Sequence, residues 1–419
     1  MTADRPPPPA AALSRSLQAA SPSPIALAGA AAAGWSLYLP VGLQYLAFGA
    51  LLWAAGHTLT QQQRWASWRA DPMVRFTLAL LAWLGLSMAW TTAPMSEAAS
   101  HLVHYARLLG VPLLALGLHP ALARHALKHF VIASCAAAAL VVAAFALDAV
   151  SPSVERWKSW PVVGVGGNQL VAVSILLALA SGLAAVQASD ARGEAARRWP
   201  WALAAAVTTL GVLLQDRRTG LVLLPVLLAV VVLARVRGTA ARVGATLGIV
   251  VLTGLLAMAS PPLQQRLAEG WGELQAYQPG QDVNTSLGMR LRMVDVTSDM
   301  ITERPWTGHG VGSWAGLWAS RVQGGELLRA HTTPHNEYLL LAAQGGLPAL
   351  MLGGAVLGGA LLAAAGVGAR RVRRPDLASL LVWITVVLAA SVNAVLRDAK
   401  LALPLLLLAG WAAARARPG

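Results

Sequence analysis

Residues 337–365 read EYLLLAAQGGLPALMLGGAVLGGALLAAA, and Glu337 is the only charged side chain among them. A helix needs about 20 predominantly apolar residues to cross the hydrocarbon core of a bilayer, so this stretch is long enough to do so. Further apolar stretches, separated by polar connections, occur on both sides of it. The sequence therefore predicts an all-α polytopic membrane protein with about 12 transmembrane helices.

The composition agrees with lipid as the solvent for most of the surface. Hydrophobic residues make up 56% of the chain and charged residues 12%, whereas soluble domains average about 25% charged. The helix count alone would also fit a transporter. The predicted spans other than 337–365 cover 25–39, 41–58, 74–91, 101–118, 127–149, 167–188, 199–214, 219–234, 242–259, 377–395 and 400–414.

The basic residues predict the orientation. A net charge of +14 would indicate nucleic-acid binding in a soluble protein. Here, 19 of the 32 basic residues lie in connections on one side of the predicted spans or in the tails, which is the positive-inside pattern. The pattern predicts an inner-membrane protein with both termini in the cytoplasm.

Four regions follow from this topology. Residues 1–24, rich in Pro, Ala and Ser, are predicted to be a disordered cytoplasmic tail. Residues 25–259 hold nine spans, 260–336 form a long, partly helical periplasmic loop, and 337–415 hold the last three spans. A loop of that length is usually functional. Its tryptophans suit an interface with lipid; they are Trp271, Trp306, Trp314 and Trp318.

Basic residues on the predicted periplasmic side run against the orientation rule. Arg217 and Arg218 stand in a tight turn, where one interpretation is snorkelling with Asp216 as partner. The other is that two guanidinium groups bind a phosphate-bearing lipid headgroup. Arg292 has Asp295 at i+3 and Asp299 at i+7, which predicts a surface ion-pair row. No carboxylate lies at those spacings from Arg290, so we assign Arg290 to ligand binding.

Thr333-Pro334 is typical of a helix start and places His335 in the first turn of the span quoted above. The positive end of a helix disfavours imidazolium, so a neutral ring able to accept a proton is expected. The alternative is an interfacial structural histidine. His331 lies four residues earlier, but Pro334 intervenes and no carboxylate motif completes a metal site.

Two further polar sites are ambiguous by sequence. Arg107 begins the fourth span, where an intramembrane arginine is functional unless it snorkels. Arg397 and Lys400 either widen the basic patch or pair with Asp398. The single cysteine, Cys135, excludes an intrachain disulfide and indicates a small core residue.

Four stretches form a series along residues 160–350: GVGGNQ at 164–169, RRTG at 217–220, RLRM followed by ERPWTGHGVG within 290–312, and PHNEYL at 334–339. The series resembles the O-antigen ligase / O-antigen polymerase superfamily of bacterial membrane glycosyltransferases. The corresponding family patterns are Gly-x-x-Asn-x-Asn, Ser-Arg-(Gly/Thr)-Gly, RL-x-M/L … E-x-P-x-x-G-x-G-x-G, and PHNxYL. Gly346 also matches the glycine that follows His-Asn in ligases. The first stretch departs from its pattern, because Gly replaces the first Asn.

The resemblance implies transfer of a glycan from undecaprenyl diphosphate on the periplasmic face, without metal, nucleotide or other cofactor. A ligase would use lipid A–core oligosaccharide as acceptor. Arg218 and Arg290 would stabilise the leaving diphosphate, and His335 would deprotonate the acceptor hydroxyl, with inversion at the anomeric carbon. The register favours Arg218 over Arg217 as the family arginine. The expected substrate-binding residues are Arg217, Asn336, His331, Arg107 and Asn168.

Three alternatives stay open. An O-antigen polymerase would use a second undecaprenyl-linked glycan as acceptor, and a protein O-oligosaccharyltransferase would use a Ser or Thr of a secreted protein. An anionic-lipid transporter or flippase would place ionisable residues near mid-membrane and show paired halves.

Overall fold

The computed structural model describes residues 22–150, 168–191, 195–215, 217–258, 261–278, 280, 285–323, 325–367 and 375–417. Every regular element in these ranges is a helix. The helices before the predicted loop are α2 (Pro24–Ser36), α3 (Val41–Gln61), α4 (Trp65–Ala70), α5 (Pro72–Leu86), η1 (Ser87–Ala89), α6 (Met95–Ala106), η2 (Arg107–Leu109), α7 (Gly110–Gly117), α8 (Pro120–Val150), α9 (Asn168–Asp190), α10 (Ala195–Leu214), α11 (Arg218–Arg235) and α12 (Thr239–Met258). Those that follow are α13 (Pro261–Ala276), α14 (Ser286–Glu303), α15 (Trp314–Arg321), α16 (Glu326–Arg329), α17 (Glu337–Ala364), α18 (Leu377–Ala390) and α19 (Ala399–Arg415).

The all-helical membrane architecture is confirmed. Each predicted span falls on a helix; for example, α9 and α17 begin within one residue of the predicted starts. Among the described residues, six segments are long and apolar enough to cross a bilayer: Pro72–Ala89, Met95–Gly117, Pro120–Leu147, Gln169–Asp190, Arg218–Arg235 and Glu337–Ala364. The count of twelve spans stays a prediction, since the other described helices are shorter or less apolar.

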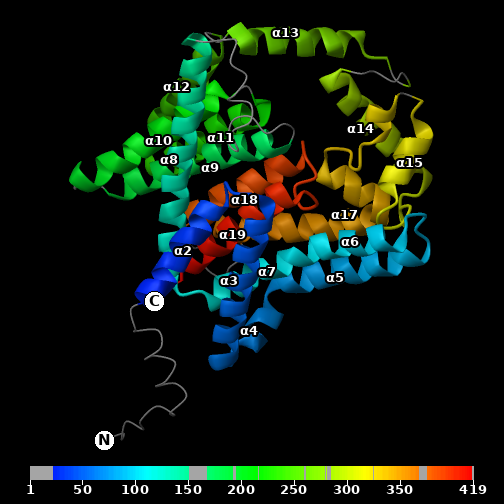
Figure 1. Cartoon of the computed structure of the whole chain (residues 1–419), viewed down its shortest axis with the longest axis horizontal. Coiled ribbons are helices and arrows are strands. Elements are labelled where there is room, and N and C mark those ends of the chain that lie inside the picture. Colours follow the sequence, from blue (N-terminus) through cyan, green and yellow to red (C-terminus); the bar gives the residue numbers. More distant parts are fainter. Residues whose placement is uncertain are drawn as a thin grey trace, which may run out of the picture.

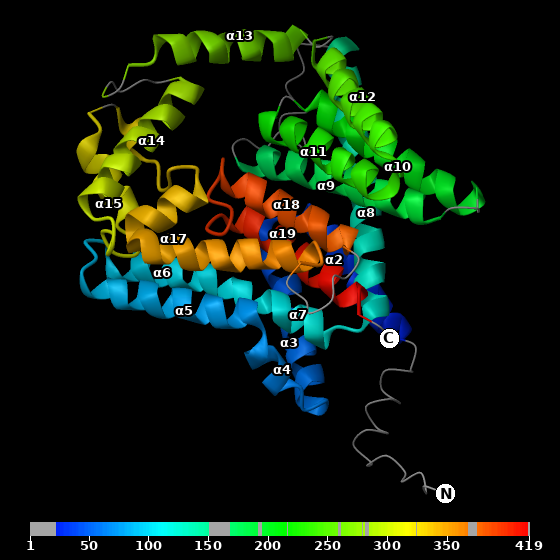
Figure 2. The ribbon, with the colours of Figure 1, turned by 180° about the vertical axis from the view of Figure 1, so that it is seen from behind.

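Helix α17 organises the half of the molecule that holds the site. It packs along α5 and also contacts α14 and α18, as both ribbon views show (Figure 1, Figure 2). Helix α9 packs between α10 and α11. Gly220 permits this approach, because a Cβ there would lie 2.8 Å from the backbone oxygen of Ser174. Since Arg218 is two residues earlier, this packing fixes the start of α11.

The described part of the predicted 260–336 loop contains four helices. Helix α13 runs from the end of α12 toward α14 (Figure 2). Helices α14 and α15 contribute Met293, Met300, Trp314 and Trp318 to a second, small hydrophobic core, which also includes Leu340 and Ala343 of α17. Both indoles are fully buried and stacked, with ring centroids 5.3 Å apart.

The prediction that all four loop tryptophans face lipid is therefore wrong for two of them. Trp314 donates from Nε1 to the hydroxyl of Thr297 at 2.9 Å, and Trp318 donates to the backbone carbonyl of Leu328 at 2.8 Å. Buried indole N–H groups need such partners, so these rings are core residues. Trp271 and Trp306 are 63% and 66% exposed.

Candidate active site

The start of α17 differs from the sequence prediction. The helix begins at Glu337, and Asn336 is its N-cap, because the side-chain oxygen of Asn336 accepts from the backbone N–H of Leu339 at 3.0 Å. Asparagine is among the strongest capping residues, which explains why the helix does not start at Thr333-Pro334. The prediction that His335 lies in the first helical turn is wrong, because His335 precedes the cap.

His335 has a left-handed backbone, with φ of 49°. Its imidazole packs edge-on against that of His331, with ring centroids 5.6 Å apart. Among the described residues no hydrogen bond reaches either ring nitrogen of His335. A non-glycine residue held at positive φ costs of order 1 kcal/mol or more and often marks a functional site.

Burial most of all, and then the nearby Arg290 and His331, lower the pKa of His335 from its ordinary 6.5 to about 4, while Asp398 acts in the opposite direction. The imidazole is therefore neutral at pH 7 and can accept a proton. A neutral imidazole was also expected from the sequence, but for a different reason. The low pKa results from burial and Arg290 and not from the positive end of a helix.

Arg290 lies in the second turn of α14, half-buried. Burial and the proximity of Arg218 both lower the pKa of Arg290, although an arginine stays protonated at any physiological pH. No ion pair to Arg290 occurs among the described residues. Two guanidinium groups, on α11 and α14, and a neutral imidazole just before α17 thus come from parts of the chain that are distant in sequence.

Arg218 is the first residue of α11, and Arg217 is its N-cap. Helix α13 approaches Arg218, since a Cβ at Gly270 would lie 3.7 Å from Nη1 of that arginine. Arg218, rather than Arg217, is the arginine that acts on Arg290. Asp216, the predicted partner of the pair, lies outside the described residues.

The ion-pair row of Arg292 with Asp295 and Asp299 stays a prediction. Asp295 accepts a hydrogen bond from the hydroxyl of Tyr277. This contact joins the residue after α13 to α14.

Arg107 is linked to the candidate site by its electrostatic interaction with Asp398. Arg107 donates to the hydroxyl of Tyr45 at 2.5 Å and is 8% exposed. Asp398 lies within electrostatic reach of both Arg107 and His335. It also caps α19, accepting from the backbone N–H of Lys400 at 2.9 Å. One carboxylate therefore interacts electrostatically with both Arg107 and the imidazole.

Arg397 has other partners than the sequence suggested. Its Nε donates to Nε2 of His101 at 2.7 Å, and it pairs with Glu97 at 3.5 Å. It forms no described ion pair with Asp398. Both partners belong to α6, so the turn before α19 is held against α6.

Glu337 is a buried residue that the sequence analysis did not assign to the site. Its carboxylate accepts from the hydroxyl of Tyr105 and from the backbone N–H of Leu396, each at 2.8 Å. Asn336 adds a bond from its side-chain amide to the backbone carbonyl of Ser391 at 2.9 Å. These contacts fix the start of α17 to α6 and to the turn between α18 and α19. A charged residue in an apolar span was the available signal.

The glycine-rich segment 305–312 docks into a kink of α17. Gly346 has φ of 67° and ψ of −168° within that helix. The N–H groups of His309 and Gly310 donate to the carbonyls of Ala343 and Gln344 at 2.9 and 2.8 Å, and Leu347 donates to Pro305 at 2.7 Å. This junction sets α14, which carries Arg290, against α17, which follows His335.

The glycines are required by close approach. A Cβ on Gly308 would lie 2.4 Å from the carbonyl of Gln344, and one on Gly310 would lie 2.4 Å from Cα of Thr91. The segment therefore positions helices, and its backbone N–H groups at 309 and 310 are already used by α17.

Asn168 is the first residue of α9, but its side chain and residues 164–167 lie outside what the structure describes. Within the described ranges, no group of three or more His, Cys, Asp or Glu side chains is arranged to hold a metal ion.

Comparison with models of known protein families matches residues 203–354 to a family described as O-antigen ligase. The match begins in α10 and ends in α17, so it includes Arg218, Arg290 and His335. No curated protein matches the chain.

Proposed function

The family match of residues 203–354 identifies the chain as a member of the O-antigen ligase and polymerase superfamily, and from this premise we propose a reaction. The protein transfers a glycan from undecaprenyl diphosphate to lipid A–core oligosaccharide on the periplasmic face of the inner membrane. The family assignment supports a membrane glycosyltransferase that uses lipid-linked glycans. The observation that carries the finer proposal is the proximity of His335 to Arg290, and of Arg290 to Arg218.

The two arginines would bind the diphosphate of the donor. Guanidinium groups contact phosphate oxygens through two parallel N–H donors. The leaving group gains negative charge as the glycosidic bond breaks, and fixed cations stabilise that charge without reorganisation. The proposed transfer needs no metal for this purpose.

His335 would act as the general base. A hydroxyl of the acceptor attacks the anomeric carbon, its proton passes to the imidazole, and the lipid diphosphate leaves with the bonding electrons. A base with a pKa of about 4 is weak at pH 7. Binding of the donor places negative charge beside Arg290, which offsets one of the causes of the low value. Donor binding would therefore strengthen the base.

Asp398 and Arg107 would support His335 electrostatically. The carboxylate of Asp398 favours the protonated imidazole that forms during transfer. Arg107 interacts electrostatically with the same carboxylate. Asn336 and His331 would contact sugar hydroxyls near the imidazole, and Arg217 and Asn168 are proposed to contact donor phosphate or sugar.

The test is transfer by purified protein in nanodiscs with donor, lipid A–core acceptor and EDTA. His335→Ala should lower the transfer rate by about 10²–10⁴-fold, the usual contribution of one proton-transfer group. His331→Ala, which changes the neighbouring ring, is the matched control and should lose much less. Donor binding should persist in His335→Ala, since the arginines remain.

Transfer by His335→Ala at the wild-type rate would place the base elsewhere. A requirement for a divalent metal would contradict the proposal that the two arginines alone stabilise the leaving diphosphate. Supplying a second undecaprenyl-linked glycan in place of lipid A–core distinguishes a polymerase from a ligase.

A further inference from the structure

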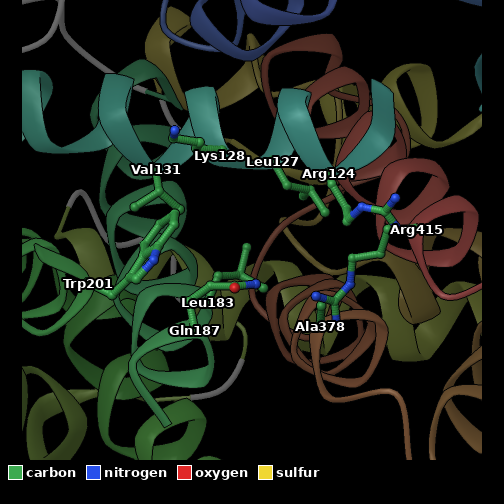
Figure 3. Close-up of a pocket in the computed structure, with 9 residues that line it drawn as sticks. All are labelled: Arg124, Leu127, Lys128, Val131, Leu183, Gln187, Trp201, Ala378 and Arg415. Atoms are coloured by element: carbon green, nitrogen blue, oxygen red, sulfur yellow. The ribbon is translucent and has the colours of Figure 1, made fainter. Parts of the chain in front are cut away.

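A cavity of about 210 Å³ lies among α8, α9, α10, α18 and α19. Figure 3 shows Arg124 and Arg415 on one side of its opening, and Val131 and Trp201 on the other. The cavity is distant from the candidate active site. Helix α18 runs from Ala378 at the cavity to Ser391 beside Asn336, about 20 Å at 1.5 Å per residue.

A second cavity of about 670 Å³ continues from the first along α8 and α10. The two share Lys128, Val131 and Trp201 in their linings. The second is bordered by apolar side chains that face outward, since Ile132 is 39% and Leu203 50% exposed. Together the cavities form one groove with a basic end and an apolar flank.

The charge at the basic end is one-sided. Arg124, Lys128 and Arg415 line the first cavity, and no acidic residue lines either cavity. Arg415 pairs with Asp376 at 2.9 Å. Even so, Nε of Arg415 is buried with no hydrogen-bond partner among the described residues. The exposed side chains of Arg124 and Lys128 have no described ion pair.

We propose that this groove binds an anionic phospholipid of the cytoplasmic leaflet, with the phosphate between Arg124, Lys128 and Arg415 and one acyl chain along Val131, Ile132 and Leu203. Positive residues predict that this end of the helices faces the cytoplasm. Basic pockets between transmembrane helices on that side suit anionic headgroups. The apolar flank selects an amphiphile over a soluble phosphate. The site is separate from the proposed transfer reaction and does not depend on it.

The test is native mass spectrometry of the full chain with phosphatidylglycerol or phosphatidylcholine of identical acyl chains. The double variant Arg124→Gln, Lys128→Gln should bind phosphatidylglycerol about 30-fold more weakly. This is about 2 kcal/mol, or about 1 kcal/mol for each basic residue removed near the surface. Its affinity for phosphatidylcholine, whose choline offsets the charge of the phosphate, should fall much less.

The matched control is Arg69→Gln, Arg75→Gln. Both arginines are exposed, lie on the same predicted side and line neither cavity. The control should retain wild-type affinity for phosphatidylglycerol, and glycerol phosphate should not displace the lipid. Equal binding of the two lipids by the wild type, equal loss in both double variants, or displacement by glycerol phosphate would each overturn the proposal.

Discussion

Replacing Gly346 by alanine should separate the candidate site's helices without touching a substrate-binding residue. The backbone there has φ of 67° and ψ of −168°, a region that only glycine occupies readily and that costs another residue about 1–3 kcal/mol. The added Cβ would also lie 2.4 Å from the backbone oxygen of Trp306. Overpacking of this kind costs typically about 1–3 kcal/mol, so the combined loss is about 2–6 kcal/mol.

The displaced group is the segment that holds α14 against α17. Moving it moves Arg290 relative to His335, and a misplacement of about 1 Å is enough to cost about 10²-fold in rate. Gly346→Ala is therefore expected to lower both the unfolding temperature and the rate of glycan transfer. The assays are tryptophan fluorescence during heating in detergent and transfer in nanodiscs.

Gly354→Ala is the matched control in the same helix. A Cβ there would meet nothing within 4 Å, and alanine is favoured over glycine in a helix by up to about 1 kcal/mol. The control should therefore be at least as stable as the wild type and equally active. If Gly346→Ala matches Gly354→Ala in both measurements, the kink does not position the site.

Three other predictions concern charge and topology. Burial and Arg290 hold the pKa of His335 near 4 in the free enzyme, so kcat/KM should fall only as the pH drops toward that value. In contrast, kcat reports the donor complex and should fall at a higher pH. If both parameters fall together, already above pH 7, this reasoning is refuted. Arg290→Ala should abolish transfer and Arg290→Lys should not restore it fully, while Arg292→Ala should keep transfer and cost at most about 1 kcal/mol of stability; equal losses at equal expression would contradict the distinction. In a cysteine-free background, Gln275→Cys should react with a membrane-impermeant thiol reagent added to intact spheroplasts and Ser67→Cys should not; the reverse labelling would invert the topology.

The helices could be predicted because their signal is local. An apolar run bounded by charges is sufficient to locate α9 or α17, whatever their neighbours are. The burial of Trp314 could not be predicted in this way, because an indole suits both a lipid interface and a protein core. The indole is buried because the methionines of α14 join it in one hydrophobic core, and only the folded chain brings these residues together.

The site shows the same division. The helical period alone predicts different roles for Arg290 and Arg292, because a missing carboxylate is visible in the spacing, and the two alanine variants test that prediction. The role of Glu337 depends on Tyr105, which lies 232 residues away, and no spacing rule reaches that far. The start of α17 was misplaced by a local conflict, since both Thr333-Pro334 and Asn336 are typical of helix starts and the side-chain oxygen of Asn336 makes the cap.

The contacts of α6 have a consequence for biosynthesis. This helix carries Glu97 and His101 into an apolar segment, and their partner Arg397 lies 296 residues after His101. At about 5–20 residues per second, the ribosome needs roughly 15–60 s to make that intervening chain. Polar side chains in lipid without partners are costly, so α6 has to wait at the interface or beside the insertion machinery. A nascent chain that stops before Arg397 would leave α6 without the partner that lets it settle in the membrane.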